Sequence, residues 1–305
     1  MVTFLGFLSK RLSEDKLGVV LSVMAATGFS LKAIFVKLAY AESSIDAVAL
    51  LSLRMLFSFP LFVWLGWVAL RTGGPLSRKD WGWLVCLGLL GYYASSMLDF
   101  MGLQYISAGL ERLILFTYPT LTLLIGVLCF GHRLNNRQLG AVLLSYVGIG
   151  VAFVHDLSVT QDQSALWLGC ALVFGSSLSY ALYNAGSEKM IHRIGSMRFA
   201  VLGMLVSTVA IQVHFLIDQP VSNLRQPSMV YVYVAAMAVF STVFPVVWQS
   251  MAVKMIGSAR MVLIGTLGPV LTIVFGALLL GEPVSMMQMM GAILVLGGVL
   301  LVSKR

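Results

Sequence analysis

The chain is divided almost throughout into apolar stretches of about 20 residues, each long enough to cross the hydrocarbon core of a bilayer as an α-helix. Hydrophobic residues make up 59% of the 305 residues, and charged residues make up only 10%. An ordinary soluble domain has about 25% charged residues. So few charges cannot cover the surface of a water-soluble fold, and we therefore expect an all-α membrane protein.

The stretches predict ten transmembrane helices joined by short loops. They cover residues 17–40, 46–70, 81–103, 108–131, 137–154, 165–190, 196–218, 229–251, 258–281 and 285–302. Turn-forming residues such as Gly73-Gly74-Pro75 and Glu282-Pro283 lie between them. Residues 1–16 are predicted to be a cytoplasmic lead-in and not a signal peptide, because no small-residue cleavage site follows a long apolar core.

The basic residues predict how the helices are oriented. If the amino terminus is cytoplasmic, Arg225 is the one basic residue in an external loop, and most of the others fall at the cytoplasmic face. These are Lys10, Arg11, Lys16, Arg71, Arg78, Lys79, Arg133, Arg137, Lys189, Arg193, Arg198, Lys254, Arg260, Lys304 and Arg305. This asymmetry predicts a multi-pass protein of the cell inner membrane with both termini cytoplasmic. The formal net charge of +8 thus reports orientation and does not indicate a nucleic-acid partner.

The chain repeats itself at a fixed offset of 150 residues, where residues 106–131 align without gaps with residues 256–281. The identical pairs include Ile106 and Ile256, Leu113 and Leu263, Pro119 and Pro269, Thr122 and Thr272, Gly126 and Gly276, and Gly131 and Gly281. We therefore expect two five-helix repeats, residues 17–154 and 165–302. Because five is odd, the second repeat crosses the membrane in the opposite direction from the first. Such inverted-topology repeats are typical of alternating-access carriers.

Short motifs mark the fourth and ninth segments of this repeat. They are Tyr105-Ile106-Ser107-Ala108-Gly109 with Pro119, Met255-Ile256-Gly257-Ser258-Ala259 with Pro269, and Gly281-Glu282-Pro283. Over nearly its whole length the chain resembles the drug/metabolite transporter superfamily, and more narrowly the EamA-type exporters. The resemblance implies a ten-helix exporter of small metabolites with a central cavity lined by helices 1, 3, 4, 6, 8 and 9. The family's Gly-Glu pair is kept at Gly281-Glu282 but is Gly131-His132 in the first repeat.

Charged side chains within membrane spans are costly, so each is a candidate functional residue. The deepest are Lys32, Arg54 and Asp99, and those nearer the outer ends are Lys37, Glu111 and Arg112. All of them belong to the first repeat. Their surplus of positive charge suits a substrate that carries a carboxylate.

The roles of these charges have alternatives. Arg54 is expected either to pair with Asp99 or Glu111 between helices or to take part in binding or coupling. Lys37 and Arg112 are expected to extend to the lipid headgroups.

Lys32 is either a ligand in the cavity or a member of a structural ion pair. Asp99, which aligns with Gln249, could exchange protons or stay ionised beside Arg54 or Lys32. Coupling to protons is therefore an open possibility.

Polar and aromatic residues on the cavity helices form a second candidate set. Together with Lys32 and Asp99, the predicted substrate-binding residues are Tyr92, Ser96, Tyr118, Ser177, Tyr180, Asn184, Trp248 and Gln249. Each of these side chains has the alternative role of bonding a neighbouring helix.

The sequence has no phosphate-binding glycine loop, no HExxH pattern and no Ser/His/Asp constellation, which argues against an ATP-driven pump or a membrane hydrolase. The cysteines have neither disulfide nor metal-ligand spacing, so we expect no metal and no cofactor. The preferred function is a secondary exporter of amino acids or related carboxylated, amphipathic metabolites. The alternatives are an uptake carrier, an exporter of cationic drugs, and a structural or lipid-translocating component whose Lys32→Ala and Asp99→Asn variants would lose only stability.

Pro119 and Pro269 occupy matching positions in their helices, where each removes one backbone hydrogen bond. Both are candidate hinges, and the alternative is a static kink that improves packing. A hinge predicts that Pro269→Ala changes the turnover of transport in liposomes. Unchanged turnover would favour the static kink.

Overall fold

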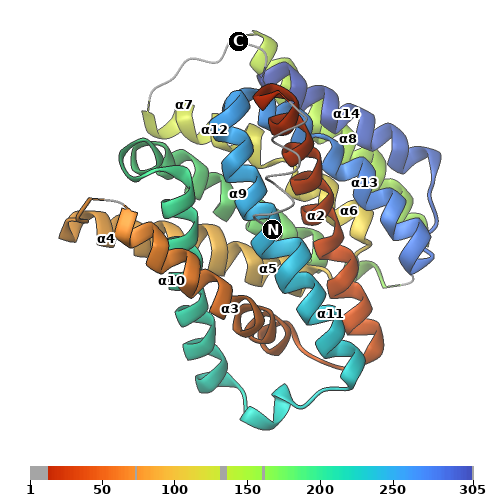
Figure 1. The fold of residues 1–305 in the computed structure, drawn as a ribbon. Coiled ribbons are helices and arrows are strands. Elements are labelled where there is room, and N and C mark those ends of the chain that lie inside the picture. Colours follow the sequence, from red (N-terminus) through yellow and green to blue (C-terminus); the bar gives the residue numbers. More distant parts are fainter. Residues whose placement is uncertain (1–12, 73, 131–135, 160–161, 304–305) are drawn as a thin grey trace.

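A computed structural model describes residues 13–72, 74–130, 136–159 and 162–303. Within these ranges every regular element is helical (Figure 1). Seven helices are long and apolar enough to cross a membrane, and three shorter apolar helices cover 138–154, 267–280 and 286–301. The predicted all-α membrane fold with ten helices is confirmed. The predicted lead-in lies largely outside the described residues.

The first half contains five helices, two of them interrupted. They are α2 (Glu14–Glu42), α3 (Ala47–Thr72), a third helix built from α4 (Arg78–Gly88), η1 (Leu89–Ala94) and α5 (Ser95–Gly102), a fourth from α6 (Ala108–Leu115) and α7 (Tyr118–Phe130), and α8 (Asn136–Val159). At the start of α4, Ser77 and Asp80 form a reciprocal capping box. This pair satisfies backbone N–H groups at the helix end.

The second half repeats this order. Its elements are α9 (Gln163–Ile194), α10 (Ser196–Asp218), the short η2 (Val221–Leu224), α11 (Ser228–Ala238), η3 (Val239–Val243), α12 (Phe244–Gly265), α13 (Leu267–Phe275), η4 (Gly276–Leu280) and α14 (Met286–Ser303). The eighth span runs from α11 into α12, and the ninth runs from the end of α12 through α13 and η4. The backbone turns at Gly257, which has φ 80°. This left-handed conformation suits glycine and separates the eighth span from the ninth.

Two irregular features of each repeat reproduce the 150-residue offset that the sequence predicts. The third helix has a π-helical turn at Leu89–Ala94, and the eighth has one at Val239–Val243. The fourth helix breaks between Leu115 and Tyr118, and the ninth breaks at Thr266. A π-turn inserts one extra residue into a helical turn and rotates the side chains that follow it. The two repeats therefore share local backbone geometry as well as residues.

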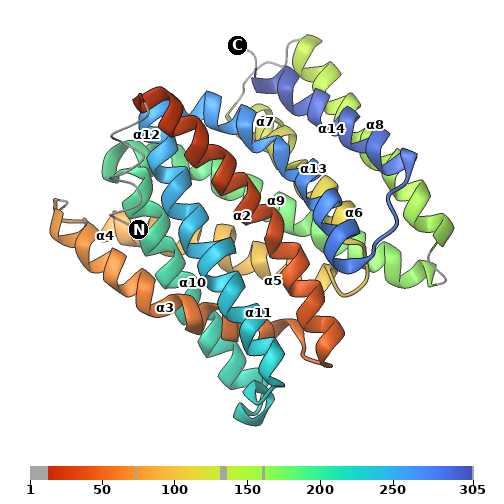
Figure 2. The same cartoon turned by 45° about the vertical axis from the view of Figure 1, so that its right-hand side comes forward.

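The packing of the helices follows the same internal symmetry. In the first view and in the view turned by 45°, α2 crosses α12, while α8 and α14 lie side by side at the edge of the bundle (Figures 1 and 2). The symmetry equivalent of the α2 and α12 contact is the packing of α9 against η1 and α5. The close approach of α2 requires Gly28, where a Cβ atom would lie 2.5 Å from the carbonyl oxygen of Phe240.

The pair α8 and α14 depends on small residues at its contact. A Cβ atom on Gly148 would lie 2.7 Å from the carbonyl oxygen of Gly291, and one on Gly291 would lie 2.5 Å from that of Gly148. Within a bilayer, such close backbone contact lets dispersion forces hold two helices together. A Cβ atom on Gly140 or Gly150 would meet nothing within 4 Å. Among the described residues, these two glycines are therefore not part of the close contact between α8 and α14.

The glycine contact predicts different results for two alanine variants of α8. Gly148→Ala forces α8 and α14 apart and should lower the free energy of unfolding by about 1–3 kcal/mol. The control Gly150→Ala has open space around it and should be neutral or raise that energy by up to about 1 kcal/mol, because alanine is the better helix former. Thermal unfolding in detergent measures both. Equal destabilisation of the two variants would contradict the assigned contact.

Candidate substrate cavity

Polar contacts tie the helices together at both ends of the bundle. At the end that the sequence predicts to be cytoplasmic, Arg193 lies 2.9 Å from Asp80. At the predicted external end, Glu282 accepts a hydrogen bond from the Ala108 N–H at 3.0 Å and lies 3.7 Å from Lys37 Nζ. Glu282 thereby joins the second half to the amino terminus of α6, where a carboxylate is stabilised by the helix dipole.

Between these ends lies a cavity of about 200 Å³. Its walls come from both repeats, including α2, the third and fourth helices, α9 and α12. The predicted binding residues that line it are Lys32, Tyr92, Ser96, Asp99, Tyr118, Tyr180 and Gln249. Arg54 and Arg112 also line it. The cavity thus gathers cations, one carboxylate and phenol rings around a space that suits a small solute.

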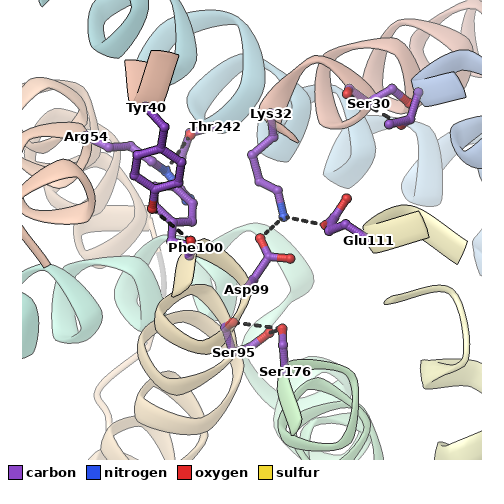
Figure 3. A network of polar contacts seen from close by, with 11 residues as sticks. Ser30, Lys32, Tyr40, Arg54, Ser95, Asp99, Phe100, Glu111, Ser176 and Thr242 are labelled. Carbon is purple, nitrogen blue, oxygen red and sulfur yellow. Dashed lines mark hydrogen bonds and ion pairs between the residues drawn. The ribbon is translucent and has the colours of Figure 1, made fainter. Parts of the chain in front are cut away.

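An ion pair centred on Lys32 lies at the cavity. Its Nζ atom lies 2.5 Å from Asp99 Oδ2 and 3.6 Å from Glu111 Oε1. Figure 3 shows Lys32 extending from α2 between the two carboxylates, which come from the third and fourth helices. Asp99 is 1% exposed and Glu111 is fully buried. One lysine therefore links three helices of the first repeat.

Arg54 does not take the ion-pair role that the sequence offered for it. Its Nε donates to Thr242 Oγ1 at 3.1 Å, and its guanidinium lies 5.3 Å from the centre of the Phe100 ring. Among the described residues, both Asp99 and Glu111 pair with Lys32 instead. The reason is geometric, because Arg54 lies beside the π-turn of the eighth helix and away from the carboxylate of Glu111 (Figure 3).

The expectation that Arg112 extends to the lipid headgroups is wrong. Its side chain is buried, and its guanidinium lies 5.2 Å from the centre of the Phe116 ring. A Cβ atom on Gly268 would lie 3.2 Å from an Arg112 terminal nitrogen, so Arg112 reaches the broken part of the ninth helix. Lys37 is held by the protein at the predicted external end, because its Nζ donates to the carbonyl oxygen of Ile106 at 2.8 Å.

Both cavity arginines have nitrogen atoms without an acceptor. Arg54 Nη1 and Arg112 Nε have no hydrogen-bond partner among the described residues. A buried guanidinium with an unmet donor is costly, and a carboxylate is the acceptor that matches its geometry. The two arginines can therefore hold an anionic group of a solute.

Tyrosines form one wall of the cavity. Tyr180 meets Tyr118 edge to face with their ring centres 5.0 Å apart, and it stacks on Tyr183 at 5.4 Å. The hydroxyl of Tyr92 bonds that of Tyr183 at 2.8 Å. This wall presents apolar ring surface next to the charged groups, which is the combination that an amphipathic solute needs.

Three of the predicted binding residues do not line the cavity. Ser177 is fully buried and bonds the hydroxyl of Thr117 at 2.8 Å, which makes it a helix contact. Asn184 donates to the carbonyl oxygen of Tyr180 on its own helix. Trp248 packs against Phe244.

The sequence interpretation missed Thr242 and Ser241, which line the cavity at the π-turn of the eighth helix. The internal repeat could have identified these two residues, because at the 150-residue offset Thr242 corresponds to Tyr92 and Ser241 to Gly91. Both counterparts line the cavity as well.

The predicted hinge residues lie at the broken parts of their helices. Pro119 is the second residue of α7, just after the break in the fourth helix, and Pro269 follows the break at Thr266. Near these breaks, Ser177 Oγ donates to the carbonyl oxygen of Leu115, and Ser30 Oγ donates to that of Gly268. His132, the counterpart of Glu282, lies outside the described residues.

Comparison with known proteins agrees with this architecture. The model of the EamA-like transporter family matches residues 16–154 and again residues 167–304. The chain belongs to the EamA-like transporter family. It is thus a member of the drug/metabolite transporter superfamily, and a transporter rather than an enzyme.

Relatives cover most of the chain. An uncharacterized transporter, YcbK, of Bacillus subtilis (strain 168) is 31% identical over 303 residues, which are 96% of this chain and 93% of that protein. A probable amino-acid metabolite efflux pump of Escherichia coli (strain K12) is 24% identical over 69% of this chain and 74% of its own length. A solved crystal structure matches with a TM-score of 0.64 at 16% identity, covering 93% of this chain and 95% of its own, and supports the fold.

The Lys32 ion pair predicts a large loss of stability on its removal. Lys32→Met leaves the buried carboxylates without their cation and should lower the free energy of unfolding by about 3–5 kcal/mol. The matched control is Arg260→Met, which removes a pair with Asp15 whose side chains are 62% and 64% exposed, and should cost about 0–1 kcal/mol.

Thermal unfolding in detergent measures both variants. Adding Asp99→Asn to Lys32→Met should restore part of the loss, because it removes one unpaired charge. Similar melting temperatures for Lys32→Met and Arg260→Met would show that Lys32 is not needed to neutralise a buried charge.

Proposed function

We propose that this transporter exports amino acids, or related carboxylated and amphipathic metabolites, by alternating access around the cavity between its two repeats. The observation that carries the proposal is the pair of buried cavity arginines, whose Arg54 Nη1 and Arg112 Nε have no acceptor within the described part of the chain. A substrate carboxylate would supply the missing acceptors. Hydrogen bonds to charged groups contribute about 1.5–3 kcal/mol each, enough to select anionic solutes over neutral ones.

The remaining cavity groups suit the rest of an amino acid. Tyr118 and Tyr180 offer ring surface to an apolar side chain. Asp99 Oδ1 faces no donor among the described residues and can accept a bond from an ammonium group. The E. coli relative, 24% identical, is named a probable amino-acid metabolite efflux pump, which supports the same substrate class.

The proposal places the protein in the cell inner membrane with both termini cytoplasmic. The distribution of basic residues supports this orientation. In the structure, Arg193 at the end of α9 lies beside the start of α4, and Arg198 donates to the carbonyl oxygen of Gly74 in the loop before α4. The basic residues near these loops therefore gather at the same end of the bundle.

Counterflow in liposomes tests the proposal. Purified protein is reconstituted into vesicles loaded with one unlabelled amino acid, organic acid or organic cation, and uptake of the labelled compound is followed. We expect exchange of amino acids. Arg54→Gln and Arg112→Gln should each weaken apparent affinity about tenfold or more, the loss expected when one charged hydrogen bond is removed.

The control variant is Arg71→Gln, which changes an arginine that lies over the exposed Trp67 ring. Its affinity should match that of the unaltered protein. Exchange of organic cations without any exchange of amino acids would overturn the assigned substrate class. Exchange of no solute would favour a structural or lipid-translocating role.

A further inference from the structure

The ion pair at Lys32 has one cation for two carboxylates. Lys32 Nζ lies within ion-pair distance of both Asp99 and Glu111, at 2.5 and 3.6 Å. Both carboxylates are buried, and they lie close enough together to repel each other. If both were ionised, one of the two negative charges would lie away from water without an ion-pair cation of its own, which is costly in a low-dielectric interior.

The other charged groups near the site act on the carboxylates only from beyond ion-pair distance. Arg54 of α3 and Arg112 of α6 face it, but neither guanidinium lies within 4.0 Å of either carboxylate among the described ion pairs. Each of them lies over an aromatic ring instead. Tyr40 of α2 also faces Asp99, and its hydroxyl donates to the carbonyl oxygen of Phe100. From α9, the neighbouring Ser176 is neutral and bonds Ser95 (Figure 3).

Three of the four carboxylate oxygens lack a hydrogen-bond donor among the described residues. Asp99 Oδ1, Glu111 Oε1 and Glu111 Oε2 have no hydrogen-bond partner among the described residues. Buried polar atoms are nearly always hydrogen-bonded, so three orphaned oxygens in one site require an explanation. A proton on one carboxyl group removes one negative charge and also creates an O–H donor. Like-charged carboxylates held at a shared site commonly retain a proton in this way.

We propose that Asp99 and Glu111 together hold one exchangeable proton, and that the ammonium group of the substrate takes its place during transport. Asp99 lines the cavity, whereas Glu111 is buried beside Lys32 and does not line it. In the resting site, Lys32 and the proton balance the two carboxylates. When a substrate ammonium approaches Asp99, the proton leaves to water on the side to which the cavity is open, and the ammonium replaces its charge.

This exchange rests on the proposed function, because it requires a substrate with both an ammonium and a carboxylate group. The carboxylate would lie against Arg54 or Arg112, which line the same cavity. Charge is conserved at each step, since one positive charge leaves the site as another enters. The consequence is an exchange of one proton for each substrate, so that a proton gradient can drive export.

Infrared spectroscopy of the purified protein tests the shared proton without any substrate. The unaltered protein should show the carbonyl stretch of a protonated carboxyl group at neutral pH. Both Glu111→Gln and Asp99→Asn should lose this band, because Lys32 alone neutralises the one carboxylate that remains. The control Glu282→Gln, which alters a carboxylate beside Lys37, should retain it.

The spectra can overturn the proposal in two ways. Absence of the carbonyl band from the unaltered protein at neutral pH would overturn the proposal even if neither variant folds. Persistence of the band in both variants would place the proton on other groups.

Liposomes that contain a pH-sensitive dye test the exchange. Vesicles are loaded with an amino acid that shows counterflow, the membrane voltage is clamped, and the vesicles are diluted into substrate-free buffer. We expect efflux of the amino acid to acidify the lumen. Glu111→Gln should abolish proton movement, measured per amino acid still transported.

The outcomes separate the two proposals. Counterflow without acidification would overturn proton exchange and leave the proposed function intact. Failure of every amino acid to exchange would overturn the proposed function, and the infrared band would still decide whether the carboxylates share a proton.

Discussion

Charges buried in a membrane must be neutralised within the protein, and the contact of Lys32 with Asp99 and Glu111 meets this need in the first repeat. Breaking such a contact leaves a charge without water or partner, so it constrains the relative position of the first, third and fourth helices. The cavity forms beside this contact. Its charged wall therefore depends on the same atoms that hold the helices together.

The two repeats share a backbone design but differ in chemistry. Both have a π-turn in the third helix of the repeat and a break in the fourth, at positions 150 residues apart. The first repeat supplies Lys32, Asp99 and Arg112 to the cavity, while the second supplies neutral groups such as Thr242 and Gln249. Symmetric backbones allow the halves to exchange conformations, and asymmetric side chains allow one solute to bind in a defined orientation.

Sequence patterns predicted much of the fold because membrane physics leaves few alternatives. The helix count and the two halves followed from apolar length and from the repeat. The predictions that failed concern where a side chain points and which group it contacts. Arg112 was expected to reach the headgroups, and its helix instead turns the guanidinium toward Gly268. Ser177 was expected to bind the substrate, but its hydroxyl instead bonds the hydroxyl of Thr117.

By itself, the sequence determined that the chain spans a membrane as helices in two matching halves, because lengths and repeats are properties of the linear chain. Only the tertiary structure decided which charges meet. Arg54 and Lys32 were equally eligible partners for Asp99 in the sequence, since both have the correct sign and similar depth. Lys32 pairs with it because the packing of α2, α5 and α6 brings its Nζ between both carboxylates, whereas Arg54 binds Thr242 at the π-turn. Ion pairing depends on ångström distances across helices, and no spacing along one chain fixes them.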